Sequence, residues 1–525
     1  MQLNIRKNEI HQLTYFWGLI LLGVSLPVSN YFMSVALFVL SLNWIVEGDY
    51  VRKWQILTNR KSLPVILSAY LLHVIGLIYS TDYQYAIHDL KIKLPLLVLP
   101  VIVGTSEKIS VSKLKIILQF FVASVFIASI ISTVAYIIMN QSWLHDRRNI
   151  SLFISHIRFS LLIDMSIFIC LYFGLYHTFK VSAKEKTLCF FLSAWFMIFL
   201  LILQSFTGIW IFITILPIML IHWFVIKRNI WLIAGISMII LAALIFTFTK
   251  LHSTFGKFYH APEITPDKLE KYTANGNPYY HDLESRLLEN GNYIYLYLCE
   301  EELRNEWSKI SNIHYDSFDN KGQVLNQTLI RYLTSKGLAK DSAGIAALDH
   351  EDIRMIENGY SNHIFKRRFA IYPRIYQFVW ELDVYMKTGK SGGHSLAQRI
   401  EYIKNGIEII RRNFWFGVGT GDVKTEFDHQ YEISDSQLGI KWRLRAHNQF
   451  VTFFITFGVI GFIWIIFSFI YAISYEKKRK EMLVLLFLLI AFLSMLNEDT
   501  LETHAGICFF SFFFSIFIFG FRKKL

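Results

Sequence analysis

Residues 441–470 read KWRLRAHNQFVTFFITFGVIGFIWIIFSFI, and this stretch passes from a basic, polar segment directly into an apolar run. The run that follows Asn448 contains no charged residue as far as Ile470. About 20 apolar residues in a helix are enough to cross the hydrocarbon core of a bilayer, which is about 30 Å thick. The stretch therefore predicts a transmembrane helix that begins at the membrane surface, next to His447 and Asn448.

The same pattern recurs along the whole chain. Of its 525 residues, 54% are hydrophobic and 16% aromatic, while only 18% are charged. A soluble globular protein does not need so much apolar surface. We therefore expect an all-α polytopic membrane protein with about twelve transmembrane helices, near residues 13–28, 31–47, 63–79, 90–104, 115–138, 152–176, 187–204, 208–226, 229–249, 447–474, 481–497 and 503–521.

The basic residues predict the orientation of these helices. One set of alternate connections receives most of the lysines and arginines, including those at 6–7, 52–61, 180–186, 227–228 and 477–480. The other short connections contain only Arg147 and Arg148, with Lys91 and Lys93 at a helix border. Cytoplasmic loops are enriched in Lys and Arg, so both termini are expected in the cytoplasm. The net charge of +12 is explained by this topology, and no nucleic acid partner is expected.

One long polar connection, residues 250–446, interrupts the apolar runs and follows the ninth predicted helix, so it is expected to face outward. It is long enough to fold as a domain of its own. Helix-like stretches at 293–310 and 323–336 predict a mainly helical loop domain. The chain is thus divided into a membrane region at 1–249, the loop domain, and a second membrane region at 447–525.

The junction between the loop domain and the tenth helix is a candidate site. His447 and Asn448 are expected at the outer membrane surface, at a helix N-terminus whose free N–H groups favour an anion. Arg443 and Arg445 add positive charge, which would favour a neutral imidazole. Such an imidazole can accept a proton from a hydroxyl while the arginines hold a phosphate. The alternative is an interfacial histidine next to an asparagine that caps the helix.

A second candidate lies just before this junction. Apolar residues recur there at helical spacing, at Leu396, Ile400, Ile403, Ile407 and Ile410. The spacing predicts an amphipathic helix over 395–412, with Arg399 at the edge of its apolar stripe. The helix is expected to stop at Asn413 and to lead into a turn in which Gly417 and Gly419 bring N–H groups near an anion. The alternative is a glycine-rich turn that only ends the helix.

Two cations lie close to apolar sequence on the expected outer side. Arg158 stands near the start of the span at 152–176, and an arginine within apolar sequence is a functional candidate by default. Lys93 stands at the start of the span at 90–104. For both residues the alternative is a side chain whose charged end reaches back to the membrane surface.

An acidic cluster separates the last two predicted helices. Glu498, Asp499 and Glu502 fall within five residues on the expected outer side. These carboxylates could orient His447 or an acceptor sugar. An ordinary solvated loop is the alternative interpretation.

These residues together resemble the O-antigen ligase and polymerase superfamily. Its members are bacterial membrane glycosyltransferases that take a glycan from an undecaprenyl diphosphate carrier on the outer face of the inner membrane. Arg399 opens a helix that leads into FGVGTG at 416–421, similar to the family's arginine, helix and Gly-x-Gly pattern. RAHNQF at 445–450 with FGVIG at 457–461 looks like its His-Asn motif and the small-residue helix that follows. The layout of about twelve helices with one large periplasmic loop completes the resemblance.

The resemblance implies roles for individual residues. His447 would activate the acceptor hydroxyl, and Arg399 would act with it as the second catalytic residue by binding the carrier's diphosphate, together with Arg158. The remaining expected substrate-binding residues are Arg445, Asn448, Lys93, Gly417 and Gly419. No metal ion and no cofactor are expected, which agrees with the lack of a clustered ligand set in the sequence. The expected partners are the lipid-linked donor, a glycan or glycolipid acceptor, and membrane lipid.

One segment departs from the family pattern. Members often have an arginine at the outer start of the helix that corresponds to 208–226, but residues 204–210 read QSFTGIW, with Phe206 or Thr207 in that place. Diphosphate binding would then fall on the other cations, Arg158, Arg399, Arg445 or Lys93, or the activity would differ from that of a typical ligase.

Several activities share the expected chemistry. The leading hypothesis is transfer of a glycan to a lipid A core sugar in the inner membrane. A polysaccharide polymerase or a protein O-oligosaccharyltransferase would differ only in its acceptor. A transporter of lipid-linked glycans is the alternative that is not an enzyme. It would be expected to show charges in the middle of several helices and repeated halves, and neither pattern is visible in the sequence.

Overall fold

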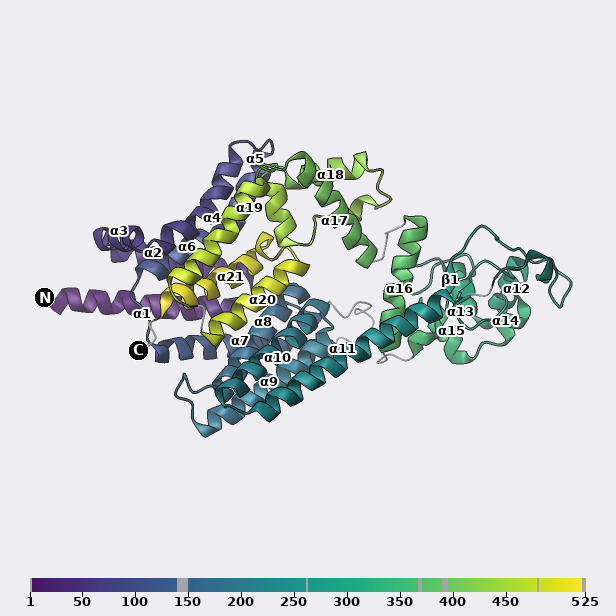
Figure 1. Ribbon diagram of the computed structural model, residues 1–525, viewed down its shortest axis with the longest axis horizontal. Coiled ribbons are helices and arrows are strands. Elements are labelled where there is room, and N and C mark those ends of the chain that lie inside the picture. Colours follow the sequence, from purple (N-terminus) through teal and green to yellow (C-terminus); the bar gives the residue numbers. More distant parts are fainter. Residues whose placement is uncertain are drawn as a thin grey trace. The chain divides into compact units, whose positions relative to one another are not determined.

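The computed structural model describes residues 2–138, 150–260, 263–366, 371–389, 395–478 and 481–521, and Arg147 and Arg148 lie outside them. The described residues are helical over most of their length, and one short antiparallel strand pair is the sheet found among them (Figure 1). The predicted all-α class is thereby confirmed.

The helices have the following bounds. The first half of the chain forms α1 (Gln2–Ser25), α2 (Asn30–Glu47), α3 (Tyr50–Asn59), α4 (Ser62–Leu77), α5 (Tyr83–Lys93), α6 (Pro95–Thr105), α7 (Val111–Ile138), α8 (His156–Leu175), α9 (Ala183–Leu203), α10 (Phe206–Ile226) and α11 (Ile230–Tyr259). The polar segment forms η2 (Pro266–Lys268), β1 (Leu288–Glu289), β2 (Asn292–Tyr293), α12 (Glu300–Ile310), α13 (Leu325–Ser335), α14 (Ser342–Ala346), α15 (His350–Glu357), η3 (His363–Lys366) and α16 (Ile371–Thr388). The chain continues through α17 (Ser395–Arg412), α18 (Val423–Ile433), η4 (Ile440–Trp442), α19 (Gln449–Tyr475), α20 (Met482–Asn497), η5 (Thr500–Glu502), α21 (His504–Ser515) and η6 (Ile516–Gly520).

Seven of the described helices are long and apolar enough to cross a membrane, namely α2, α7, α8, α9, α10, α11 and α19. An eighth span results if α3 and α4, which are bent by 90° at the break between them, count as one. The helix α20 and the segment His504–Gly520 are apolar but shorter. The structure therefore confirms a helical, multi-pass membrane protein, while the total of twelve spans and their orientation stay predictions.

Helix α8 is the most deeply buried of these spans. Ser155 begins it by accepting a hydrogen bond from the backbone N–H of Arg158. Every residue from Arg158 to Phe173 is buried, and α8 packs against α7, α9, α10 and α20. Arg158 thus enters the protein interior at the first turn of a central helix.

The chain forms two compact units. Unit 1 comprises 1–236, 402–436 and 443–525, and unit 2 comprises 237–401 and 437–442. The predicted loop domain at 250–446 corresponds to unit 2 only in part, because most of its last 45 residues pack with the membrane helices. The core of unit 1 is formed by the apolar faces of the membrane helices.

Within unit 1, α4 and α19 lie side by side although they are far apart in sequence (Figure 1). At one end, Glu476 accepts two hydrogen bonds from the Arg60 guanidinium, at 2.6 and 2.7 Å. At the other end, the Asp422 carboxylate accepts hydrogen bonds from the backbone N–H groups of Thr81 at 2.7 Å and Asp82 at 2.8 Å. The pair is therefore tied together at one end by Arg60 and Glu476, and at the other end the segment after α4 is tied to Asp422, which begins α18.

Unit 2 has a separate core in which α12, α13 and α15 surround Trp307 and Tyr332. The prediction of a helix over 323–336 is confirmed by α13, but the helix predicted over 293–310 begins only at Glu300. The residues before it are drawn into a two-residue hairpin, because Asn290 and Gly291 take positive φ values of 48° and 78°. An Asn-Gly pair of this kind is the strongest short-range signal for such a turn.

Candidate active site

Helix α17 has the bounds that its sequence predicts, Ser395–Arg412, and its apolar stripe is not the face that is most buried. Ile403 and Ile407 on the apolar stripe are 39% and 41% exposed, whereas Tyr402 and Ile409 on another face are buried. In a membrane protein an apolar stripe can face lipid, so it does not have to face the core. The face of α17 that packs inward contains Tyr402 and Gly406, and a Cβ atom at Gly406 would contact Val451 of α19.

The glycine-rich turn after α17 packs tightly against α19. Gly417 and Gly419 have positive φ values of 72° and 91°, and a Cβ atom at Gly417 would lie 2.4 Å from the Thr456 backbone. The N–H groups of Val418 and Gly419 donate to backbone carbonyl groups of α19 at 2.8 and 3.0 Å. These N–H groups are therefore already used in packing, and substrate contact by Gly417 and Gly419 stays a prediction.

Helix α19 is interrupted where this turn approaches it. Gly458 has φ 62° and ψ −171°, outside helical values, and the N–H group of the next residue, Val459, donates to the carbonyl of Phe414 at 2.8 Å. Without a side chain at Gly458, the backbone at Trp415 can approach this break closely. The glycine-rich turn after α17 and the glycine-containing break in α19 therefore pack closely against each other.

His447 and Asn448 directly precede the N-terminus of α19. The Asn448 side chain accepts hydrogen bonds from the N–H groups of Phe450 and Val451 at 3.0 and 3.1 Å and donates to the carbonyl of Leu496 at 2.9 Å. The interpretation of Asn448 as a helix cap is confirmed, and its contact with substrate stays a prediction. His447 has φ 48°, a left-handed conformation that is unusual for a residue other than glycine. Such conformations cluster at functional sites.

The His447 imidazole lies between an aromatic ring and a carboxylate. Its Nδ1 is 3.3 Å from Oε2 of Glu498, and its ring centroid is 5.5 Å from that of Tyr402. Glu498 is only 4% exposed, so the interpretation of the acidic cluster as a solvated loop is wrong for this residue. A carboxylate at this distance holds the proton on Nδ1 and leaves Nε2 as the basic nitrogen. The surroundings of His447 are therefore mixed in charge rather than purely positive.

Glu502 is the centre of a buried ion-pair network next to this histidine. Its carboxylate lies 2.8 Å from Nζ of Lys93 and 2.9 Å from Nη1 of Arg445. Lys93 also pairs with Asp89 at 2.6 Å, and Gln449 donates to Glu502 at 2.9 Å. Glu502 therefore already neutralises part of the charge of Lys93 and Arg445. Each of these cations would divide its charge between Glu502 and any bound diphosphate.

Arg158 reaches the same connection from α8. Its guanidinium donates to Oγ1 of Thr503 and to the carbonyl of Asp499, both at 3.0 Å. Arg158 is 8% exposed, and its Nη1 has no hydrogen-bond partner in the described part of the chain. One donor of a buried cation is thus left for a ligand, which agrees with a role in anion binding.

The carboxyl groups of this connection differ in charge state. Burial by itself would raise the pKa of Glu502, but Lys93 and Arg445 beside it lower that pKa below its ordinary value. Burial, together with the charge of Glu502, raises the pKa of Asp499. Asp499 also accepts a hydrogen bond from Thr452 at 2.8 Å. Glu502 is therefore the firmly ionised member that neutralises Lys93 and Arg445.

Several of the predicted site residues lie in one region of the structure. His447, Arg158, Arg445 and Lys93 all contact residues of the connection 498–503. Arg399 lies in the part of α17 that belongs to unit 2, and its catalytic role stays a prediction.

Three further residues that support the site were not predicted, namely Gln449, Thr452 and Asp89. Asp89 precedes Lys93 by four residues, and this helical ion-pair spacing was a usable signal. Gln449 and Thr452 lie in apolar sequence, where nothing marks their partners.

The segment that lacks the family arginine begins α10. Ser205 caps this helix, and its hydroxyl donates to that of Ser160 in α8 at 3.0 Å. Phe206 is 77% exposed, and Thr207 is buried. The start of α10 therefore contacts α8 at Ser160, two residues after Arg158. Arg158 thus lies on the helix that the start of α10 contacts.

The fold and this cluster define a multi-pass helical membrane protein with a charged, mostly buried site at the head of one membrane helix. Residues 355–466 match the O-antigen ligase family, and the matched segment contains Arg399, the glycine-rich turn and the His447–Asn448 motif. This match supports membership of the O-antigen ligase and polymerase superfamily, to which the sequence motifs also point. Members are glycosyltransferase-like enzymes that act on glycan or lipid-linked substrates. No curated protein matches the chain.

Proposed function

We propose that this protein transfers a glycan from undecaprenyl diphosphate to a hydroxyl group of an acceptor at the periplasmic face of the bacterial inner membrane. The observation that supports it best is the His447 imidazole beside the buried Glu498 carboxylate, at the head of a membrane helix and next to a cationic cluster. A base and cations so arranged suit the two demands of the reaction, a deprotonated acceptor and a stabilised leaving group.

The proposed step is a single displacement. Nε2 of His447 removes the proton from the acceptor hydroxyl, while Glu498 holds the other ring nitrogen. The acceptor oxygen forms a bond to the anomeric carbon, and the bond from that carbon to the diphosphate oxygen breaks. The electron pair leaves with undecaprenyl diphosphate, and the proton stays on His447 until solvent removes it. Attack opposite the leaving group inverts the anomeric configuration.

The departing diphosphate needs positive charge. Arg158 has an unused Nη1 donor within the described chain and lies close to the start of α10. Arg399 is assigned to the diphosphate by the family resemblance. Arg445 and Lys93, which already share Glu502, contribute a positive field with less direct contact. Charge-assisted hydrogen bonds to phosphate are about twice as strong as neutral ones, so the unused Nη1 donor of Arg158 is well suited to hold the diphosphate.

The acceptor is proposed to be a lipid A core sugar, as in an O-antigen ligase. A polymerase would use a second carrier-linked glycan, and a protein O-oligosaccharyltransferase would use a protein hydroxyl. The residues described above are the same for all three acceptors. Supplying all three acceptors to one purified preparation therefore decides between these activities.

The proposal is tested with purified protein, a carrier-linked oligosaccharide and the candidate acceptors. His447→Ala and Arg399→Ala are expected to abolish transfer. His429→Ala and Arg411→Ala are the matched controls, because both residues are exposed and lie outside the site. These controls should transfer glycan like the wild type. Normal transfer by His447→Ala would contradict the proposal, and release of glycan to water without transfer would indicate a hydrolase.

A further inference from the structure

A hollow of about 590 Å³ lies within unit 2, at the end of α11. Small-molecule sites in proteins have volumes of roughly 300–1,000 Å³, so this hollow is large enough for one. Its lining includes His252, Gly256 and Lys257 of α11, His260 directly after that helix, and Tyr372 and Tyr376 of α16. We call it the α11 pocket.

One face of α11 forms the floor of the α11 pocket. His252, Gly256 and His260 follow each other at intervals of four residues, which places them on one side of a helix. A Cβ atom at Gly256 would meet nothing within 4 Å. The helix backbone at Gly256 is therefore open to the pocket, with polar side chains on both sides of it.

An aromatic wall stands on the α16 side. The ring of Tyr376 packs edge-on against Phe258, with centroids 5.4 Å apart, and its hydroxyl donates to Glu289 at 3.1 Å. That hydroxyl also accepts a hydrogen bond from the backbone N–H group of Asn290 at 2.6 Å. Tyr376 is thus fixed in place, and the half-buried Tyr372 lies 6.2 Å from it. The wall is preformed, so a ligand would not need to order it.

The polar groups of the α11 pocket include both donors and acceptors. Within the described chain, the side chains of His252, Lys257 and His260 have no hydrogen-bond partner, and the lining contains no carboxylate. The last carbonyl groups of a helix lack partners inside that helix and add acceptors at the end of α11. Sugar hydroxyls both donate and accept hydrogen bonds, and the apolar face of a sugar ring packs on an aromatic ring. The lining therefore suits a saccharide.

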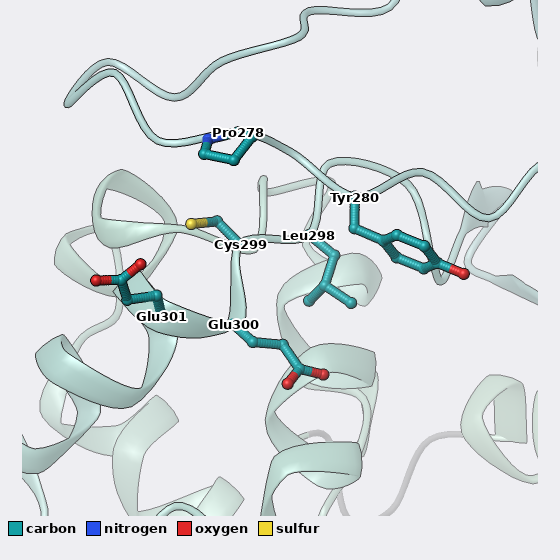
Figure 2. A pocket seen from close by; sticks show the side chains of 6 residues that line it. All are labelled: Pro278, Tyr280, Leu298, Cys299, Glu300 and Glu301. Carbon is teal, nitrogen blue, oxygen red and sulfur yellow. The ribbon is translucent and has the colours of Figure 1, made fainter.

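A second hollow in unit 2 is less suitable. It has a volume of about 200 Å³ and is lined by residues 278, 280 and 298–301. Figure 2 shows the carboxylates of Glu300 and Glu301 pointing in different directions and the ring of Tyr280 turned away from Cys299. Its polar groups do not converge on a ligand.

We propose that the α11 pocket binds one or two sugar residues of a glycan chain. The identity of this occupant rests on the proposed function, since a glycosyltransferase needs to hold its glycan beyond the reacting sugar. Binding remote from the reacting bond improves orientation of the substrate at the site of transfer. The pocket would thus act as a glycan subsite in the long polar segment.

The test uses the full-length protein in lipid nanodiscs and a printed array of bacterial surface oligosaccharides, followed by calorimetric titration of a retained sugar. Gly256→Leu places a side chain in the α11 pocket from a position where a Cβ atom meets nothing within 4 Å. It should weaken sugar binding by at least about tenfold. Gly235→Leu is the matched control, because Gly235 lies in the same helix, is also open, and is outside the pocket. Lys257→Ala, at an exposed position, is a second variant that should also weaken binding.

The outcomes separate this inference from the proposed function. Wild type, Gly235→Leu and His447→Ala should bind the sugar equally, and only His447→Ala should lose transfer completely. Failure of the wild type to retain any sugar, or wild-type binding by both pocket variants, overturns the pocket assignment and leaves the transfer reaction untouched. Equal loss of binding in Gly235→Leu and Gly256→Leu also overturns it.

Discussion

At the scale of single residues, the contact between His447 and Glu498 has the clearest consequence. Glu498→Gln should lower kcat by about 10- to 100-fold with little change in KM, because the amide no longer fixes which ring nitrogen is basic. Steady-state kinetics of purified protein measure both parameters. Glu432→Gln, at an exposed position, is the matched control and should be active. A rise in KM alone would indicate instead that Glu498 binds substrate.

Glu502 is expected to control stability through its charge. Glu502→Gln should destabilise the protein by about 3 kcal/mol at neutral pH, because it leaves Lys93 and Arg445 without their shared partner. The pKa of Glu502 is lowered in the folded state, so its stabilising effect is complete above about pH 4.3 and declines as the pH falls below that value.

Thermal unfolding in detergent at pH 8, 6 and 4 measures this effect. The difference between wild type and Glu502→Gln should be constant from pH 8 to pH 6 and should begin to narrow near pH 4. A difference that disappears between pH 8 and pH 6 would mean that another group, and not Glu502, carries the charge.

At the scale of elements, the fit between the glycine-rich turn and the break in α19 can be tested directly. Gly417→Ala and Gly458→Ala each place a Cβ atom within 2.4 Å of backbone and at a positive φ. Each change should destabilise the protein by more than about 1 kcal/mol. Gly235→Ala, in open space within α11, should be neutral or stabilising. Melting of the purified variants compares them, and an unchanged Gly458→Ala protein would contradict the close packing.

The elements also show which features of the fold a sequence pattern predicts and which it does not. The spacing of Ile403 and Ile407 was sufficient to predict the bounds of α17 but not its buried face. That face depends on whether an apolar stripe meets lipid or protein, which periodicity does not record. Likewise, the position of Glu498 suggested a partner for His447, but the burial of the acidic connection depends on helices that are distant in sequence. The chemistry of these residues was predictable here, and the burial of each face was not.

At the scale of the whole molecule, the predicted orientation has a simple test. Alkaline phosphatase fused after Arg228 should be inactive, and the same enzyme fused after His260 should be active, because α11 is expected to cross the membrane between these points. Enzyme assays on whole cells measure both fusions. A green fluorescent protein at the C-terminus should fluoresce, since that protein folds in the cytoplasm. The reverse pattern would place the long polar segment in the cytoplasm and contradict the proposed function.

The ties at both ends of the α4 and α19 pair have a consequence for how the molecule is assembled. Arg60 with Glu476, and Thr81 with Asp422, join parts of unit 1 that precede residues 237–401 to parts that follow them. The membrane helices are therefore held together by side-chain contacts, independently of the covalent link through unit 2. Two polypeptides produced from a gene split within unit 2 should find each other in the bilayer and copurify, and charge reversal at Glu476 should separate them.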